Sequence, residues 1–216
     1  MKNVLCFGDS NTWGFIPESI TGPFPERHPF AVRWTGVLSR ELGSGFRVIE
    51  EGQNGRTTVH DDPFAAVRNG KAVLPAILES HKPLDLVILM LGTNDLKAVF
   101  SVTPGEIATG VKVLAQMILG SDAGINNRPP RLLIMCPPII GDQPHLPDVA
   151  AKFPNAQHDS RQLPRHYEAL ATMLGCAYLN TQSLVEPGSD GIHLDAAAHA
   201  KLGLAVAAAV KSILPA

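Results

Sequence analysis

Short apolar runs alternate along the chain with stretches in which apolar residues recur at helical spacing. An apolar run of about four to eight residues that is bounded by turn-forming residues is typical of a buried strand. The predicted strands are residues 4–7, 46–50, 85–91, 131–136 and 177–180, and the predicted helices are 31–42, 72–81, 104–119, 156–174 and 195–214. Strands that alternate with helices form a parallel sheet with right-handed crossovers, so the pattern predicts an α/β fold.

Local signals mark several helix ends. Thr103, Pro104 and Glu106 have the spacing of a capping box with proline in the first turn. Asp195 has the residue type of an N-cap for the last helix. Trp34 falls within a predicted helix, and we expect it to pack on the sheet rather than to contact a substrate.

Two proline-rich segments, residues 14–30 and 137–155, interrupt the alternation. Both leave the edge of the sheet at which the strands end, and long ordered loops in compact domains are usually functional. We expect them either to wall an active site or to mediate contact between subunits.

The composition limits the class of protein. The chain has 216 residues, of which 45% are hydrophobic and 18% charged, and a net charge of -2. This is the profile of one soluble globular domain spanning residues 1–216. No basic run with interleaved aromatics occurs, so we expect no nucleic-acid partner.

The cysteines and the apolar runs indicate a compartment. Cys6, Cys136 and Cys176 each lie in or beside an apolar run, which argues against a disulfide framework and favours a reduced cytoplasm. The first apolar run is too short for a signal peptide, and no stretch approaches the roughly 18 apolar residues of a spanning helix. The prediction is therefore a cytoplasmic protein without a membrane partner.

Candidate chemistry begins at Ser10, which follows the first predicted strand after Gly8 and Asp9. A serine at this position is a nucleophile or a helix cap. Near the other end, Asp190 and His193 lie three positions apart in a glycine-containing turn. An aspartate that accepts from one imidazole nitrogen leaves the other nitrogen free to take a hydroxyl proton, although each of the two is also an ordinary loop residue.

A serine nucleophile also needs donors for the oxygen that becomes negative during the reaction. Gly55 and Asn94 follow the second and third predicted strands, at the same sheet edge as Ser10. Gly55 offers a backbone N–H at close range and Asn94 offers its side-chain amide. Segments of this type are also common turns. The hypothesis is an oxyanion hole made by Ser10, Gly55 and Asn94.

Four stretches in this order resemble the GDSL, or SGNH, hydrolase family. They are 8–10 (Gly-Asp-Ser), the loop of Gly55, 92–95 (Gly-Thr-Asn-Asp) and 190–193 (Asp-Gly-Ile-His). The resemblance extends, through residues such as 32–38 and 48–52, to the bacterial arylesterases with acyltransferase and perhydrolase activity. This chain has Asn54 and Gly55 where that branch carries Ser-Ala. We expect this difference to change the shape of the pocket.

The resemblance implies a three-layer α/β/α sandwich with five parallel strands in the order 2-1-3-4-5 and a homo-oligomer whose loops narrow a channel to the serine. It implies a serine esterase that forms an acyl-enzyme on Ser10 and passes the acyl group to water, alcohols or peroxide. We expect no cofactor and no metal, and a short-chain ester such as an aryl acetate, because Trp13, Ile192 and the two proline-rich segments suggest a confined apolar pocket. Asn11, Trp13 and Ile192, beside the catalytic residues, are predicted to line the substrate pocket, although packing is an equal alternative for Trp13.

Other interpretations are weaker or remain open. Residues 60–62 contain a histidine and two aspartates, but zinc sites need three or four ligands at suitable spacing, so we expect a turn there. The Gly-x-Ser-x-Gly nucleophile elbow and the nucleotide-binding glycine fingerprints are missing from the sequence. A carbohydrate acetylesterase of the same family is the alternative enzyme, and a non-catalytic binding module is the alternative from another class.

Overall fold

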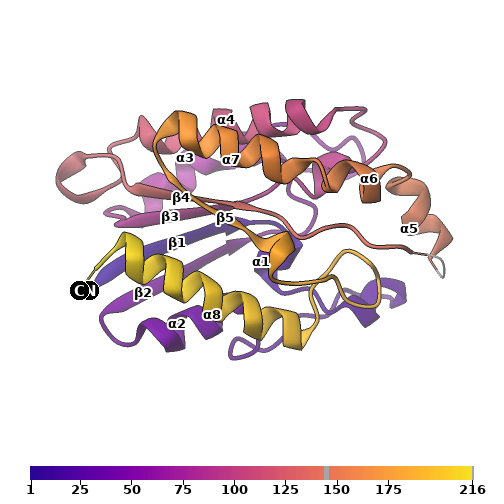
Figure 1. The fold of residues 1–216 in the computed structure, drawn as a ribbon, viewed down its shortest axis with the longest axis horizontal. Coiled ribbons are helices and arrows are strands. Elements are labelled where there is room, and N and C mark those ends of the chain that lie inside the picture. The colour runs from indigo at the N-terminus through magenta and orange to yellow at the C-terminus, as the bar shows by residue number, and fades with distance from the viewer. Residues whose placement is uncertain (144–145, 216) are drawn as a thin grey trace.

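A computed structural model describes residues 1–143 and 146–215, and its centre is a five-stranded parallel sheet (Figure 1). The strand order is β2-β1-β3-β4-β5, with every neighbouring pair parallel. The strands are β1 (Lys2–Gly8), β2 (Phe46–Gly52), β3 (Leu86–Met90), β4 (Arg131–Cys136) and β5 (Ala177–Asn180). The predicted fold class and strand order are confirmed.

Helices cover both faces of the sheet, as the ribbon in Figure 1 shows. One face carries α3 (Gly70–His81), α4 (Pro104–Leu119) and α7 (Leu163–Leu174), and the other carries α2 (Trp34–Leu42) and α8 (Ala196–Ile213). Shorter helices lie at the carboxyl end of the sheet: α1 (Ser10–Trp13), α5 (Pro147–Lys152) and α6 (Ala156–Ser160), with 3-10 turns at Pro17–Thr21, Asn94–Leu96 and Thr181–Ser183. A further 3-10 turn, Ile125–Asn127, lies at the amino end, before β4.

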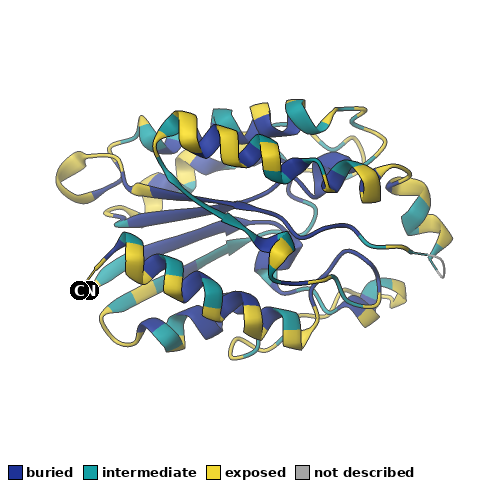
Figure 2. Ribbon diagram, in the orientation of Figure 1, coloured by how far each residue is buried: buried dark blue, intermediate teal, exposed yellow. Residues whose placement is uncertain are grey.

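The core consists of two apolar layers because successive side chains of a strand point to opposite faces. Along β1, Leu5 and Phe7 belong to the layer under α3, α4 and α7, whereas Val4 and Cys6 belong to the layer under α2 and α8. Figure 2 shows the central strands buried along most of their length and the helices exposed on their outer sides. Central strands buried on both faces explain the continuous apolar runs of the sequence.

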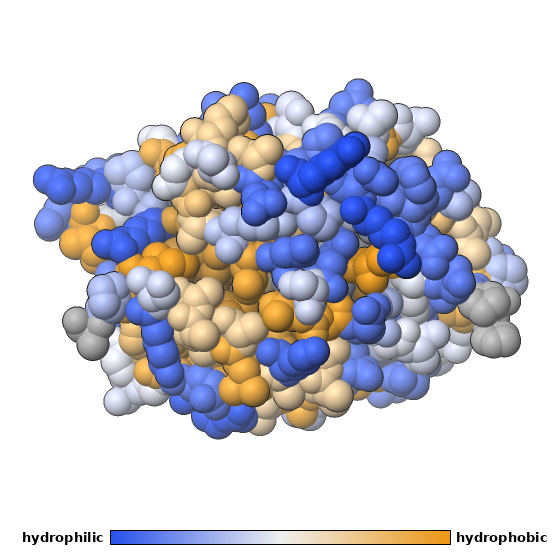
Figure 3. All heavy atoms as spheres, viewed as in Figure 1, coloured by the Kyte–Doolittle hydropathy of each residue, from blue (hydrophilic) through white to orange (hydrophobic). Residues whose placement is uncertain are grey.

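The edge strand β5 is only half-buried along its length. On the face shown in Figure 3, hydrophobic residues gather along the middle, between the two helical layers, and hydrophilic residues cover much of the outer rim. The middle of that face is where β5 runs in Figure 1.

Most predicted helix ends agree with the structure. The capping box at the start of α4 is present, since the Thr103 side chain accepts from the N–H of Glu106 and the Glu106 carboxylate accepts from the N–H of Thr103. Trp34 is fully buried in the layer between α2, α8 and the sheet. Helix α2 begins at Trp34 rather than at residue 31, because the chain from Pro29 to Arg33 forms a turn.

The helix predicted over residues 156–174 is two helices. α6 ends at Ser160 and α7 starts at Leu163, with Pro164 in its first turn. Proline lacks the N–H that a continuing helix needs, so it is tolerated at a helix start and breaks a helix interior. The prediction of one continuous helix is therefore wrong.

The proline-rich segments contain short helices: a 3-10 helix, Pro17–Thr21, in the first and α5 in the second. Pro144 and His145, which belong to the second predicted segment, lie outside the described residues.

Helix α8 has the length and the apolar composition of a membrane-crossing helix, contrary to the sequence-based expectation. Its residues Leu202, Val206 and Val210 are buried in the same layer as Trp34 and Leu38 of α2. A core helix of a globular protein has these properties too, and the packing of α8 fits that explanation. Among the described residues, the three cysteines are free.

Candidate active site

Ser10 lies at the turn between β1 and α1. Asp9 is the N-cap of α1, and its Oδ1 accepts a hydrogen bond of 3.0 Å from the N–H of Asn11. Asp9, and not Ser10, is therefore the cap of α1, so the alternative role of Ser10 as a helix cap is wrong. Gly8 allows the tight turn, since a Cβ there would lie 2.1 Å from Oγ1 of Thr12.

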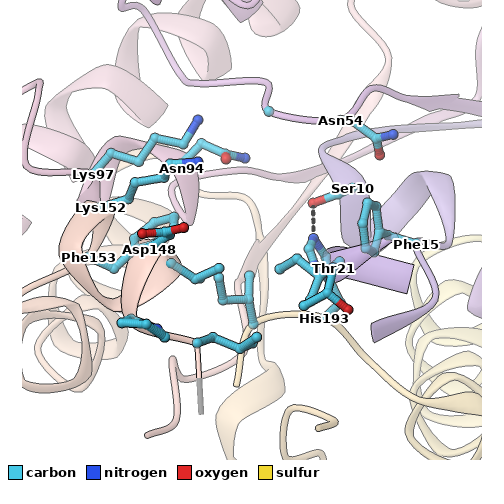
Figure 4. A pocket seen from close by; sticks show the side chains of 16 residues that line it. Ser10, Phe15, Thr21, Asn54, Asn94, Lys97, Asp148, Lys152, Phe153 and His193 are labelled. Atoms are coloured by element: carbon cyan, nitrogen blue, oxygen red, sulfur yellow. Dashed lines mark hydrogen bonds between the residues drawn. The ribbon is translucent and has the colours of Figure 1, made fainter. Parts of the chain in front are cut away.

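The Ser10 hydroxyl is the first group of a hydrogen-bonded chain. Its Oγ lies 2.9 Å from Nε2 of His193 (Figure 4), and Nδ1 of His193 lies 2.5 Å from Oδ2 of Asp190. The other Asp190 oxygen accepts from the backbone N–H groups of Ile192 and His193, both at 2.8 Å. Gly191, with φ of +72°, allows this turn. Both carboxylate oxygens of Asp190 thus have donors, and His193 is held between an acid and a hydroxyl.

Asp9 is the other buried carboxyl group near Ser10. Burial raises its pKa to about 6, and its hydrogen bond to Asn11 acts against that shift. Because its side chain caps α1, Asp9 serves the turn and not the imidazole.

The predicted oxyanion donors meet at the same edge. Ser10, Gly55 and Asn94 all line one cavity. Among the described residues, no backbone oxygen of a turn or loop accepts from the N–H groups of Ser10 and Gly55. Gly55 has φ of +77°, which favours glycine. Nδ2 of Asn94 donates to the Arg56 carbonyl oxygen at 3.1 Å, and an amide has a second N–H to offer.

A tyrosine supports the turn before Asn94. The Oη of Tyr167 donates to the Leu91 carbonyl oxygen at 2.8 Å. Gly92, with φ of +123°, passes so close to this hydroxyl that a Cβ would lie 2.2 Å from it. A glycine is therefore required there.

Arg56 is a functional candidate that sequence reasoning missed. Its side chain is buried beneath the loop of Gly55, where it donates to the backbone oxygens of Gly8 and Glu51 and lies over the ring of Phe7 at 4.3 Å. Burial lowers its pKa to about 10, so the guanidinium remains charged at neutral pH. The only sequence signal is a charged residue in an otherwise uncharged loop.

The cavity beside Ser10 has a volume of about 600 Å³ and two different walls. Figure 4 shows Ser10, His193, Phe15 and Asn54 on one side, with Asn94, Lys97, Lys152 and Asp148 across from them. Phe15 stacks on the imidazole of His193 with ring centroids 4.0 Å apart. The complete lining is Ser10, Phe15, Ile20, Thr21, Asn54, Gly55, Asn94, Lys97, Leu146, Pro147, Asp148, Val149, Lys152, Phe153, Ile192 and His193.

Of the residues predicted to line the pocket, Ile192 does so and Asn11 and Trp13 do not. The Asn11 amide donates to the Ile192 carbonyl oxygen at 3.2 Å and accepts from the N–H of Leu194 at 3.0 Å, so it braces the backbone around His193. The Trp13 ring lies against the guanidinium of Arg27, 5.1 Å from the ring centroid, which supports the packing alternative.

Both proline-rich segments contribute to the cavity, through Ile20 and Thr21 from the first and through α5 from the second. Their position at the cavity agrees with the expectation that they wall a site at the carboxyl edge of the sheet.

The described residues contain no group of three histidine, cysteine or acidic side chains arranged to hold a metal. Asp62 instead accepts from the N–H of Phe64 at 2.9 Å, as expected of a turn, and pairs with Lys97 at 3.2 Å. Asp95 accepts from both the N–H and the hydroxyl of Thr58, and burial raises its pKa.

Residues 6–201 match the model of the GDSL-like lipase/acylhydrolase family. The chain belongs to this family. The resemblance noted in the sequence is thus confirmed, and the family comprises carboxylic ester hydrolases. A comparison with curated proteins gave no match.

Solved structures of similar proteins cover nearly the whole chain. An aryl esterase of M. smegmatis is 43% identical, with a TM-score of 0.94, over 99% of this chain and 100% of that one. Est24, a carbohydrate acetylesterase from Sinorhizobium meliloti, is 40% identical, with a TM-score of 0.95 over the same shares. A putative arylesterase from Agrobacterium tumefaciens is 40% identical, with a TM-score of 0.88, again over 99% and 100%.

Proposed function

We propose that this chain is a serine esterase that cleaves short-chain esters through an acyl-enzyme on Ser10. The observation that carries the proposal is the chain of hydrogen bonds from Asp190 through His193 to Ser10, which ends in a cavity. The similar aryl esterase and carbohydrate acetylesterase support an ester as the substrate.

In the first half of the reaction, Nε2 of His193 takes the proton from Oγ of Ser10 as that oxygen attacks the ester carbonyl carbon. The carbonyl oxygen becomes an oxyanion, and the N–H groups of Ser10, Gly55 and Asn94 are the donors that we assign to it. When the tetrahedral intermediate collapses, His193 gives its proton to the leaving alcohol or phenol. The acyl group then remains on Ser10.

In the second half, His193 removes a proton from an incoming water, alcohol or peroxide, which attacks the acyl carbon. A second tetrahedral intermediate forms and collapses, and Ser10 recovers its proton from His193. Because one acyl-enzyme serves all three acceptors, we propose that the enzyme transfers acyl groups as well as hydrolysing them.

We propose that a small acyl group lies on the apolar surface beside Ser10. Phe15, which stacks on His193, and Ile192 provide that surface, and Phe153 lies on the opposite wall (Figure 4). A series of nitrophenyl esters of increasing acyl length should show the highest kcat/KM for the shortest chains, and a maximum at long chains would refute this.

An acetylated sugar is the second candidate substrate. The wall across from Ser10 carries Lys97, Asp148 and Lys152, whose polar groups suit the hydroxyls of a carbohydrate (Figure 4). Comparing kcat/KM for acetylated sugars and for aryl acetates separates the two assignments.

The central test uses nitrophenyl acetate with the wild type, Ser10→Ala and a matched control, Ser183→Ala, whose exposed hydroxyl donates only to the Asn180 carbonyl oxygen. Activity should disappear only in Ser10→Ala, and a fluorophosphonate should label the wild type at Ser10. With a primary alcohol present, acetyl ester of that alcohol indicates transfer, whereas acetate alone indicates hydrolysis. Activity that survives in Ser10→Ala would refute the proposed nucleophile.

A further inference from the structure

Arg56 connects the three segments that carry the proposed oxyanion donors, two of them through its side chain and the third through its backbone carbonyl. One of its nitrogens, Nη1, donates to the Gly8 carbonyl oxygen at 2.8 Å, two residues before Ser10, and also to the Glu51 carbonyl oxygen at the end of β2. Its own carbonyl oxygen accepts from Nδ2 of Asn94. A single residue therefore contacts the end of β1, the end of β2 and the segment after β3.

Arg56 also shapes the turn that presents Gly55. Its N–H donates to the Gln53 carbonyl oxygen at 3.1 Å, and its Nε donates to Oε1 of the Gln53 side chain at 3.2 Å. These two bonds close the turn of residues 53–56, in which Gly55 has φ of +77°. The orientation of the Gly55 N–H thus depends on where the Arg56 side chain is held.

The position of Arg56 is itself fixed. The residue is 4% exposed, and its guanidinium lies against the buried ring of Phe7. A planar guanidinium offers several donors in a rigid arrangement, which suits it to joining separate backbone oxygens. An aliphatic side chain in its place would leave the Gly8 and Glu51 oxygens without this donor.

We propose that Arg56 is a positioning residue of the esterase reaction, which holds the N–H groups of Ser10 and Gly55 and the amide of Asn94 in one oxyanion site. The proposal rests on the function assigned above. Arg56 does not line the cavity, so it acts through the donors and not on the substrate. It therefore affects the tetrahedral intermediate more than the bound ester.

The test compares Arg56→Met with Arg33→Met. Arg33 is a matched control because it is 7% exposed, donates to a backbone oxygen of His28, lies over the ring of Phe30 and pairs with Glu50. Its contact with β2 is an ion pair with the Glu50 side chain, and its hydrogen bonds do not involve Gly8, Glu51 or Asn94. Both variants should lower the melting temperature, so stability alone does not distinguish them.

Activity and inhibitor binding should distinguish them. We expect Arg56→Met to lower kcat about 100-fold with KM within about 3-fold of the wild type, since misplaced donors cost roughly as much as a lost one. Phenylboronic acid forms a tetrahedral anionic adduct with a serine oxygen, and its inhibition constant should rise in step with the loss in kcat. Arg33→Met should keep kcat and the inhibition constant within about 3-fold of the wild type.

A second variant covers the case in which Arg56→Met does not fold. Arg56→Lys retains the charge, but its single ammonium lacks the planar fork. It should lower kcat about 10-fold and weaken phenylboronic acid to the same extent. Wild-type kcat and inhibition by Arg56→Lys, or equal losses in Arg56→Met and Arg33→Met, would overturn the positioning role.

Fluorophosphonate labelling separates this proposal from the function on which it rests. If Ser10 of the wild type is labelled and the Arg56 variants keep the wild-type kcat, only the role of Arg56 fails. If Ser10 of the wild type is not labelled, the acyl-enzyme mechanism fails and the positioning role fails with it.

Discussion

The stability of the fold at acid pH should depend on His199. This histidine of α8 is fully buried, and its Nδ1 accepts from the N–H of Trp34 at 3.2 Å. Burial lowers its pKa to about 3, and the neighbouring charges of His28 and Arg33 act in the same direction. In the unfolded chain a histidine titrates near 6.5. The folded state therefore holds His199 neutral at a pH where the unfolded state is protonated.

The magnitude follows from that difference. Because the pKa of His199 is lower in the folded chain than in the unfolded chain, His199 does not reduce the free energy of unfolding above pH 6.5. Its effect lowers that free energy progressively as the pH falls from 6.5 toward 3. Between about pH 7.5 and pH 4.5 the unfolded histidine takes up its proton and the folded one does not. One pH unit corresponds to about 1.4 kcal/mol, so the loss over the two units below 6.5 is roughly 3 kcal/mol.

The perturbation is His199→Asn, in which Oδ1 takes the place of the Nδ1 acceptor and nothing titrates. Urea unfolding at both pH values gives the free energy of unfolding of each protein. At pH 7.5 the variant should be less stable because the smaller side chain leaves a cavity. At pH 4.5 its deficit should shrink, or reverse, by roughly 3 kcal/mol, since all other titrating groups cancel in the comparison. The same deficit at both pH values would refute the reasoning.

Three further predictions concern the site. Asn94→Ala should lower the kcat for nitrophenyl acetate by roughly 10²–10³ with a small change in KM, because it removes one oxyanion donor; a raised KM with unchanged kcat would contradict that role. Asp190→Asn should lower kcat roughly 10⁴-fold because an amide favours the wrong imidazole tautomer. Asp9→Asn should instead leave kcat close to wild type, and its melting temperature relative to wild type should improve from about pH 4 to pH 8, because the raised pKa of Asp9 makes ionisation unfavourable in the fold. The reverse pattern in the two aspartates would show that the acid has been misassigned.

The sheet was predictable from the sequence because buried strands require continuous apolar runs. The predicted strands 131–136 and 177–180 coincide with β4 and β5, and the strand before Ser10 is extended by only a few residues. The break between α6 and α7 was missed because Ala156 to Leu174 keeps a helix-compatible composition and only Pro164 marks the second start.

The candidate site was predictable only in part. Ser10, Asp190 and His193 stand in glycine-containing turns whose residue types already suggest chemistry, and the structure places them within hydrogen-bonding distance. Trp13 and Phe15 show what sequence could not decide. Gly14, with φ of +90°, turns the chain between them, so Phe15 stacks on His193 and Trp13 lies under Arg27.

Residues that act through the backbone leave even less trace in the sequence. Asn11 and Arg56 bind carbonyl and N–H groups of distant segments, and any segment offers such groups whatever its side chains. The segment 137–155 was expected to wall the site, but the residues of α5 that line the cavity could not be named, because α5 lies more than one hundred positions from Ser10 along the chain. Only the three-dimensional arrangement brings these residues together.

The separation of Ser10 from His193 has a consequence for how activity arises during synthesis and refolding. Ser10 follows the first strand, whereas His193 lies just before α8, which packs against α2. A ribosome-bound chain that has exposed the proposed nucleophile and four strands still lacks the proposed general base. Hydrolytic activity should therefore appear only after the last segment has docked. The rate at which ester hydrolysis returns during refolding would measure that step, which spectroscopic signals of the sheet do not report.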